Sequence, residues 1–486
     1  MESILLSEDA KKKIRIVALL NDLDPGSYTT HYIASLSPFS KQTVLYLLDS
    51  ISEDLEECFG YHFFDSNRRI PGGGTLIDTN RYHQFLIHKS VPYQFVLFIL
   101  LTPHKTFNDF CTEQFMSASS VRRLLRPFLT FLETFEMKIN LSSMKIEGNE
   151  YEIRLVLNAL LWIGSSGRDL IEDDPFRQKH IEVLKKIGFW DCPFINNNEM
   201  LTILTVAKLR IENGCPVDSF PLKNNHLPDQ EIESLTEYLR QFLPNNSYLH
   251  TELPFYIYCL YYDFLAFDAQ DIRIHYLEEY IRIEKEQSED TFWLLFDELI
   301  HLVATETEMT SSQILMVSSN LSSILLGFFL NRRPLPNKNE ISRHETVFPY
   351  IYQSSFEFIQ AFTKKVSRRK GLGWIANVSN ELNPYLSYVV KPYLCKKKKV
   401  IVAITPLPNF ILMRTLTEFL ASFSFVEVVY RDKNDPEVDL FISTFQVFVP
   451  ETSSNTFLVD VRGIPGNTKE QLFKKLYALY QKKNSH

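Results

Sequence analysis

The most informative part of this sequence is Ser117-Ala-Ser-Ser-Val-Arg-Arg-Leu-Leu-Arg-Pro-Phe128. Its larger apolar residues recur at the spacing of one helix face, namely Val121, Leu124, Leu125 and Phe128. Serine is a favoured residue immediately before a helix, because its hydroxyl accepts a bond from a free backbone N–H of the first turn. The three arginines, Arg122, Arg123 and Arg126, fall on the other side. The segment therefore predicts a helix with an apolar inner face and a basic outer face.

An earlier part of the chain repeats the spacing around this helix. The repeat consists of Ile33, Ala34, Val44 and Leu47, which stand 77 residues before Phe110, Cys111, Val121 and Leu124. In a helix-turn-helix, a small residue lets the first helix approach the second, whose apolar residues face back onto it. A serine again precedes the second helix, at Ser40. We therefore predict two helix-turn-helix units, each with a second helix suited to the major groove of DNA.

A hairpin is predicted directly after the arginine-rich helix. Residues 135–140 and 144–148 alternate around a serine-containing turn, a pattern typical of a β-hairpin. Such a wing would place Lys138 and Lys145 near backbone phosphates. The residues expected to contact DNA are Ser119, Ser120, Arg122, Arg123, Arg126, Lys138 and Lys145 in the second copy, with Lys41 and Gln42 in the first. Five acidic residues follow between 49 and 57, so we expect the first copy to contribute less.

Composition and charge exclude several classes of protein. The chain has 486 residues, of which 45% are hydrophobic and 13% aromatic, with 38 Phe against 15 Gly. These values exclude a disordered or collagen-like chain and favour long packed helices. The formal net charge is −8, and residues 251–310 hold 14 acidic and only three basic side chains. A nucleic-acid site must therefore be a local basic patch on an acidic protein.

The chain shows no sign of secretion, of a membrane span or of a metal site. The six cysteines form no CxxC pair, and no HExxH motif occurs, so we expect neither a metal nor a cofactor. The N-terminus lacks the basic and apolar regions of a signal peptide. The most apolar stretches, including 91–101 and 321–330, fall short of the roughly 20 residues that a membrane helix needs. We therefore expect a cytoplasmic protein.

The rest of the chain divides into a helical middle and a different C-terminal end. Residues 175–390 read as amphipathic helices with short connectors, enough for two bundles of about five helices each. From residue 400, β-branched runs alternate with helical patterns, as in a small α/β unit with a parallel sheet. The loop after its first strand, 405–409, has no Cys, Lys or Gly run for phosphate chemistry. The predicted fold is a mainly α multidomain protein with a small C-terminal α/β domain.

This order of units resembles the Mga/AtxA family of virulence regulators of Gram-positive bacteria, over essentially the whole chain. The resemblance implies winged helix-turn-helix domains at 1–72 and 73–165, the second being the main DNA-binding domain. It implies two phosphotransferase-system regulatory domains, or PRDs, as all-helical bundles at 166–286 and 287–392. It also implies a domain like the IIB component of sugar permeases at 396–486. The implied function is a transcriptional regulator, not an enzyme.

The resemblance also implies regulation by phosphorylation. Histidines of such PRDs are phosphorylated by phosphocarrier proteins of the sugar phosphotransferase system, and His226, His275 and His301 are the candidates here. The bases near His275 are Arg273, Arg282 and Lys285, so a phosphate on His275 could either pair with Arg273 or loosen the bundle contact. The IIB-like domain lacks the Cys that its family phosphorylates in the loop after the first strand, and Cys395 does not replace it. Dimerisation of the chain is therefore the expected role of this domain.

Two other functions remain open from the sequence. An RNA-binding antiterminator with the same bundles would need a short all-β N-terminal domain, whereas residues 1–165 look largely helical. A phosphocarrier enzyme of the phosphotransferase chain would need the missing Cys. The favoured partners are promoter DNA, phosphocarrier proteins and a second copy of the chain, with no membrane.

Overall fold

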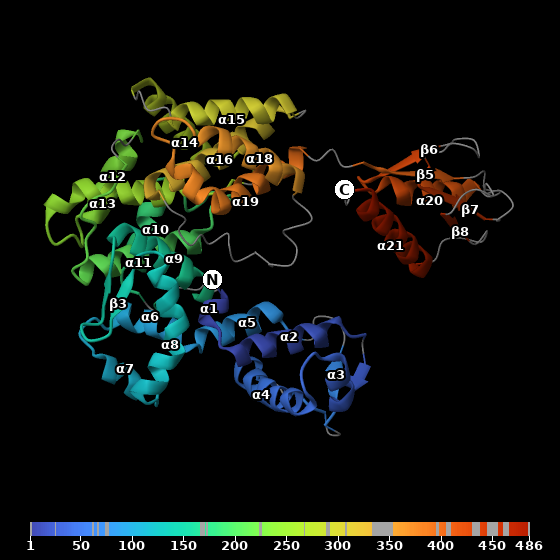
Figure 1. The fold of residues 1–486 in the computed structure, drawn as a ribbon, viewed down its shortest axis with the longest axis horizontal. Helices are drawn as coiled ribbons and strands as arrows, with labels where there is room; N and C mark the ends of the chain where they lie inside the picture. The colour runs from blue at the N-terminus through green and yellow to red at the C-terminus, as the bar shows by residue number, and fades with distance from the viewer. Residues whose placement is uncertain are drawn as a thin grey trace. The chain divides into compact units, whose positions relative to one another are not determined.

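The structure is a computed structural model of the whole chain. The residues that it describes are 2–24, 26–60, 63–65, 68–72, 77–165, 171, 174–222, 226–266, 268–287, 292–306, 309–332, 353–394, 398–404, 410–429, 438–444, 455–459 and 466–484. Two compact units are present, and the second contains the C-terminal residues from Val390 onward. The first unit holds the helix-turn-helix copies and most of the helical middle (Figure 1).

Both predicted helix-turn-helix copies are confirmed as helix pairs. The first pair is α3 (Thr30–Leu36) and α4 (Lys41–Phe59), and the second is α7 (Phe107–Glu113) and α8 (Ala118–Glu133). The side chains of Ser40 and Ser117 cap α4 and α8 by accepting from the backbone N–H three residues on. The other helices of this part are α1 (Glu2–Leu5), α2 (Glu8–Asp22), α5 (Thr79–His88), α6 (Val91–Leu101) and α9 (Glu150–Ser165).

Each copy carries a two-stranded antiparallel sheet, but only the sheet of the second copy is a hairpin. In the second copy both strands follow the helices, as β3 (Lys138–Asn140) and β4 (Lys145–Glu147). In the first copy β1 (Gly26–Tyr28) precedes the helices and pairs with β2 (Ile70–Gly72), which follows them. The predicted wing is thus confirmed in the second copy, in a shorter form than 135–148.

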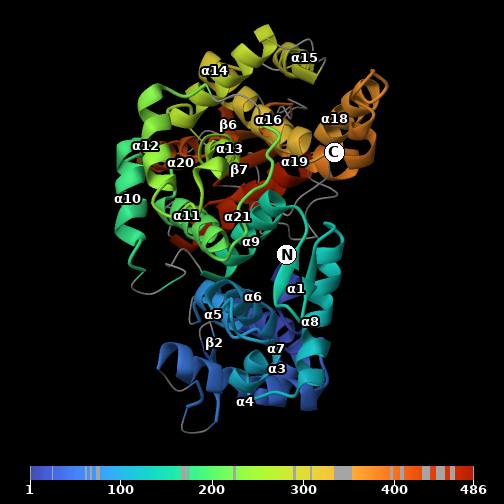
Figure 2. The ribbon, with the colours of Figure 1, turned by 90° about the vertical axis from the view of Figure 1, so that its left-hand side faces the viewer.

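A single hydrophobic core runs through both copies. Buried residues from Leu5 to Ile163 belong to it, together with Val206 from the helical middle. Helix α9 packs against α6 and α11 (Asn197–Glu212), which also contact each other (Figures 1 and 2). The two copies therefore share one interior, which crosses the predicted domain boundary at residue 72.

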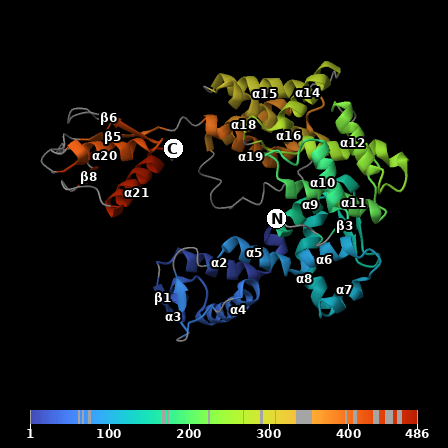
Figure 3. The same ribbon diagram turned by 180° about the vertical axis from the view of Figure 1, so that it is seen from behind.

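The described residues of the middle part form helices with connectors between them, as predicted. Residues 166–286 contain α10 (Arg177–Lys186), α11, α12 (Asp229–Leu239), α13 (Leu249–Ile257) and α14 (Ile272–Gln287), with a 3-10 turn at Asn246–Tyr248 and a π-helical turn at Tyr258–Tyr262. Residues 287–392 contain α15 (Phe292–Glu306), α16 (Ser311–Asn331), α18 (Gln353–Val366) and most of α19 (Trp374–Leu394). Helix α14 packs on α16, across the predicted boundary at residue 286 (Figure 3).

Helix α16 corrects the expectation that every apolar stretch is too short to span a membrane. It has 21 residues, and among the described residues it alone is long and apolar enough, unless α5 and α6, bent by 60°, are counted as one span. More than half of its apolar window is buried in the protein. Its Asn320 bonds both backbone groups of Ala266, and Ser323 bonds the backbone of Phe264 and Tyr262. These bonds satisfy the backbone that leaves the π-helical turn, so α16 is built as a core helix of the bundle.

The C-terminal unit contains the predicted parallel sheet. Its strands are β5 (Val400–Ile404), β6 (Val426–Val429), β7 (Leu440–Ser443) and β8 (Thr456–Leu458), in the order β6-β5-β7-β8. All three pairings are parallel. Helices α20 (Phe410–Ala421) and α21 (Gly466–Lys483) pack on β6 and β5. The loop at 405–409 and Cys395 lie outside the described residues.

Candidate nucleic-acid interface

Helix α8 presents its three arginines to solvent, as the sequence predicted. Its inner face is formed by Val121, Leu125, Phe128 and Leu132, which are buried, with Leu124 partly buried. Arg122, Arg123 and Arg126 are exposed. The guanidinium of Arg122 lies 5.0 Å from the centre of the Phe107 ring, a cation–π contact that orients it. Within the described part of the chain, Arg123 and Arg126 make no hydrogen bond or ion pair, so both guanidinium groups are available to a ligand.

The two predicted serines of α8 lie at its N-terminus. Ser119 is exposed, whereas Ser120 is half-buried. The Ser117 hydroxyl lies 3.0 Å from that of Ser119 and donates to that of Ser120 over 2.9 Å. Ser120 is therefore part of the helix cap, and Ser119 is the freer of the two.

The wing exposes Lys138 and Lys145 to solvent on a face that also carries an acidic residue. Ile139 and Ile146 face inward, so Lys138, Asn140, Lys145 and Glu147 share the outer face. Lys138 lies opposite Glu147 in the ladder, and Glu147 accepts a bond of 3.1 Å from the Asn140 side chain. One acidic group therefore reduces the positive charge of this face. Glu147 was not predicted at this face, although its i, i+2 spacing from Lys145 puts both residues on one face of a strand.

The tip of the wing is held by Asn140. Its side-chain oxygen accepts from the backbone N–H of Ser142 at 3.0 Å and of Ser143 at 3.2 Å. Such bonds stabilise a turn that starts at an Asn. Met144 completes the turn at a positive φ of 54°. The wing is thus a fixed turn next to α8, which packs against β3.

The first copy exposes Lys41 and Gln42 at the start of α4, as predicted. These residues belong to a different helix from the arginines of α8. Two of the acidic residues that follow form ion pairs with basic residues of the chain. Asp49 pairs with Arg68 at 2.7 Å, and Asp54 pairs with Lys13 at 2.6 Å. Arg68, one of the two arginines before β2, is thereby engaged within its own copy.

The C-terminal half of α4 also attaches the first copy to the second. The Tyr82 hydroxyl, on α5, donates to Asp54 over 2.7 Å, and Lys89 pairs with Glu57. Arg81 donates to the carbonyl of Cys58 over 2.8 Å and stacks on Phe59. These contacts give the acidic side of α4 a role in joining the two copies.

The three histidines predicted as phosphorylation sites lie on different elements with different access. His275 on α14 and His301 on α15 are exposed. His226 precedes α12, is only 14% exposed, and has its Nε2 3.6 Å from a Glu284 carboxylate oxygen. The three histidines therefore lie on three different segments of the chain.

The base expected to receive a phosphate on His275 is already bound. Arg273 is buried and makes two bonds to Asp271, of 3.0 and 2.6 Å, while its guanidinium lies 4.4 Å from the centre of the Phe264 ring. Arg282 pairs with Glu279 and Glu286, and Lys285 with Asp297. Arg273 is therefore already paired, and the other alternative, that a phosphate on His275 loosens the bundle contact, stays a prediction.

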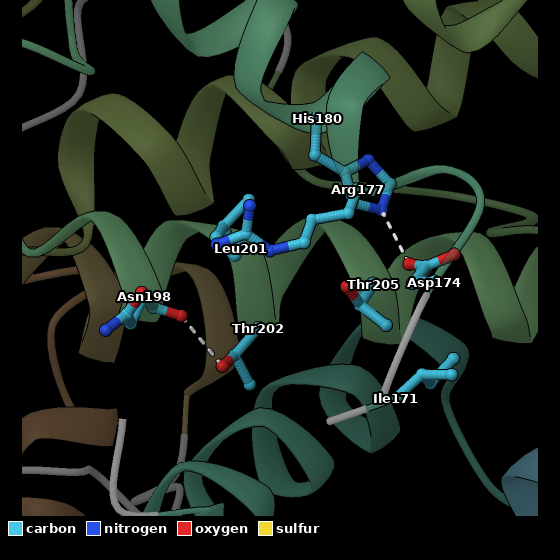
Figure 4. A pocket seen from close by; sticks show the side chains of 8 residues that line it. All are labelled: Ile171, Asp174, Arg177, His180, Asn198, Leu201, Thr202 and Thr205. Atoms are coloured by element: carbon cyan, nitrogen blue, oxygen red, sulfur yellow. Dashed lines mark hydrogen bonds and ion pairs between the residues drawn. The ribbon is translucent and has the colours of Figure 1, made fainter. Parts of the chain in front are cut away.

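A histidine that sequence reasoning passed over, His180, lines a small polar pocket (Figure 4). Its ring is 1% exposed, with Nδ1 2.8 Å from the Tyr238 hydroxyl and Nε2 3.7 Å from an Asp174 carboxylate oxygen. Burial lowers the pKa of His180 to about 4 despite the opposing effect of Asp174. The ring is therefore neutral at pH 7, and its contact with Asp174 is not an ion pair. Such burial withholds the ring from another protein.

The geometry around α8 and its wing is that of a DNA-binding domain: an exposed basic helix and an adjoining hairpin on a common core. Residues 77–161, which run from the start of α5 through the wing into α9, match the family model of the Mga helix-turn-helix domain. This match supports a DNA-binding transcriptional regulator of the Mga type. No curated protein matches the sequence of the chain.

Proposed function

We propose that the protein is a promoter-binding transcriptional regulator of the Mga/AtxA type, controlled by sugar uptake. The observation that supports it most is the pair of unpartnered guanidinium groups, Arg123 and Arg126, on the outer face of α8 within the matched residues 77–161. Arginine side chains of this kind reach guanine edges or phosphates from the major groove. As a regulator of DNA it works in the cytoplasm.

Control by the phosphotransferase system would act through the two helical bundles, which we take to be PRDs. His275 and His301 are the better acceptors because their rings are exposed, with His226 less accessible. Incubation with the general phosphotransferase proteins and phosphoenolpyruvate, followed by mapping of acid-labile phosphate, tests this part. Label on His275 or His301 supports it, and His180→Gln serves as a control that should leave the label unchanged. Absence of label from all three histidines contradicts it.

We also propose that the chain acts as a homodimer, because one basic helix on an acidic protein offers few phosphate contacts. The C-terminal α/β unit is the candidate for the dimer contact. Light scattering of the full chain and of a chain without residues 396–486 tests the assignment. A truncated chain that stays dimeric would place the contact in the helical bundles instead.

The alternative of an RNA-binding antiterminator is less well supported. It requires an all-β N-terminal domain, whereas the described residues before 165 are mainly helical. A gel-shift of the full chain against promoter fragments, with matched RNA of the same sequence, separates the two. Retardation of the duplex DNA supports the proposed function, and retardation of the RNA alone contradicts it. A phosphocarrier enzyme rests on the loop at 405–409, which lies outside the described residues.

A further inference from the structure

The turn between α7 and α8 holds an aromatic side chain almost entirely in solvent. Phe115 is 97% exposed, the highest value among the large hydrophobic side chains that are exposed in the described residues. It is two residues before the cap of α8, Ser117. An apolar ring in this position gains nothing from folding, since it remains in water.

The backbone at Phe115 is also unusual for its residue type. Its φ is +51°, in the left-handed region that bulky residues rarely adopt. The backbone N–H of Phe115 bonds Thr112 O at 3.1 Å, and that of Met116 bonds Cys111 O at 3.0 Å. These two bonds form a Schellman motif, in which glycine is the usual residue at the left-handed position. Phenylalanine therefore stands where glycine would be less strained and would expose no apolar surface.

The first copy shows that the turn does not require this arrangement. Counting back 77 residues, the position of Phe115 is occupied by Pro38. There α3 ends at Leu36, Ser37 after it is extended, and Pro38 is not among the residues with positive φ. Tyr32 and Tyr46 of the first copy are 46% and 59% exposed, but they lie on its helices, so at this turn the exposed ring belongs to the copy with the unpartnered arginines.

We propose that Phe115 makes a direct apolar contact with DNA beside the N-terminus of α8. This inference rests on the proposed function and names a further residue of the same interface. The N-terminal end of a recognition helix is the part that enters the major groove, so the turn before it lies close to the bases and the backbone. Two surfaces of DNA are apolar enough to cover the ring, the methyl group of thymine and the face of deoxyribose.

The contact is tested with Phe115→Asn in the full chain, on duplexes selected from a random pool by the wild type. Asparagine tolerates the left-handed conformation, so the turn and the fold should persist. We expect Phe115→Asn to weaken binding about tenfold, as the loss of a partly buried aromatic contact implies. Phe115→Tyr should retain most of the affinity. Leu36→Asn, which removes an exposed apolar side chain two residues before Pro38 in the first copy, is the control.

The dependence on salt and on thymine identifies the contact. Because the contact is apolar, the slope of log K against log salt should be the same for Phe115→Asn and the wild type. Replacing each thymine by deoxyuridine removes one methyl group. A replacement that weakens DNA binding by the wild type but not by Phe115→Asn assigns the contact to that methyl group. If no replacement changes the affinity of the wild type, the contact is assigned to deoxyribose.

The outcomes separate this inference from the proposed function. If Phe115→Asn binds as tightly as the wild type while Arg122→Ala/Arg123→Ala loses affinity, the DNA contact of Phe115 is wrong and the interface stands. If Phe115→Asn keeps the affinity of the wild type for DNA but loses transcriptional output, the ring contacts another protein instead. If neither variant changes binding, the proposed interface itself is wrong.

Discussion

Arg154 and Glu252, 98 positions apart in the chain, form a two-bond ion pair in which neither side chain reaches solvent. The bonds measure 2.7 and 2.9 Å, and the two residues are 1% and 0% exposed. Glu252 also accepts from the backbone N–H of Val217 at 2.7 Å, while Glu150 binds both Arg154 and Arg210. Arg154 lies on α9, directly after the wing, and Glu252 lies on α13 of the first bundle. The pair therefore connects the DNA-binding part to the helical middle through one continuous helix.

Replacing Glu252 by Gln should destabilise the first unit strongly. The change leaves the Arg154 guanidinium buried with only Glu150 to neutralise it, and breaking one partner of a buried pair costs about 3 to 5 kcal/mol. Urea unfolding followed by circular dichroism measures the loss. Lys186→Ala breaks the exposed pair with Glu237 and should change the free energy of unfolding by less than about 1 kcal/mol. Equal effects of the two variants would contradict a structural role for the buried pair.

Arg122→Ala and Arg123→Ala should each weaken specific DNA binding by about 1 to 3 kcal/mol, the usual value of an arginine contact to a base. Both guanidinium groups face solvent on α8 in the free protein, so their removal should leave the fold intact. Fluorescence anisotropy with a promoter duplex measures the change. Arg240→Ala removes an exposed arginine from the bundle and is the matched control. Unchanged affinity in the Arg122/Arg123 double variant, with the circular dichroism of the wild type, would refute the interface.

Lys138→Ala should act on every DNA sequence alike. A lysine that touches a phosphate releases one condensed counterion, so its loss should reduce the slope of log K against log salt by about one. Glu147→Gln should do the opposite and raise affinity, because it removes the negative charge from the outer face of the wing. Titrations at several salt concentrations, on specific and non-specific duplexes, test both. A slope that stays the same in Lys138→Ala would show that Lys138 does not contact a phosphate.

Acid should destabilise the protein through His180. Its pKa falls from 6.5 to about 4 on folding, so the unfolded state binds the proton more readily between these values. His180 therefore does not change the free energy of unfolding above pH 6.5. As the pH falls toward 4, it lowers the free energy of unfolding by about 3 kcal/mol in total. His180→Gln should lose less stability than the wild type between pH 7 and pH 5, while His301→Gln, at an exposed site, should follow the wild type. Parallel curves for wild type and His180→Gln in urea unfolding would disprove the effect.

Local patterns were enough to predict the elements that surround the interface. The stripe of Val121, Leu125 and Phe128 predicted both α8 and the exposure of its arginines, because helix periodicity alone decides which side is buried. The hairpin and the parallel sheet followed from alternation and from β-branched runs in the same way. In each case the interacting residues lie within one element or two adjacent ones.

Features that depend on distant partners were not predicted. The burial of Arg154 requires Glu252, almost a hundred residues away, and neither periodicity nor spacing relates the two. The burial of His180 depends on Tyr238 and Asp174, on separate segments. Phe115 was missed for another reason: its left-handed conformation comes from how α7 ends, and the usual sequence signal of such an end is a glycine, which is absent here.

The common core of the two helix-turn-helix copies has a consequence for the DNA that the protein recognises. Tyr82 on α5 and Lys89 directly after it bond to α4, and the buried residues of both copies form one core. The distance and orientation between the two copies are then fixed, so the copies do not bind DNA independently. If both copies contact DNA, one base pair inserted between the two contacted DNA segments rotates one segment by about a tenth of a helical turn relative to the other. The two copies cannot rotate relative to each other to match this change. Sites that bind both copies would therefore be selected for their spacing as strictly as for their bases.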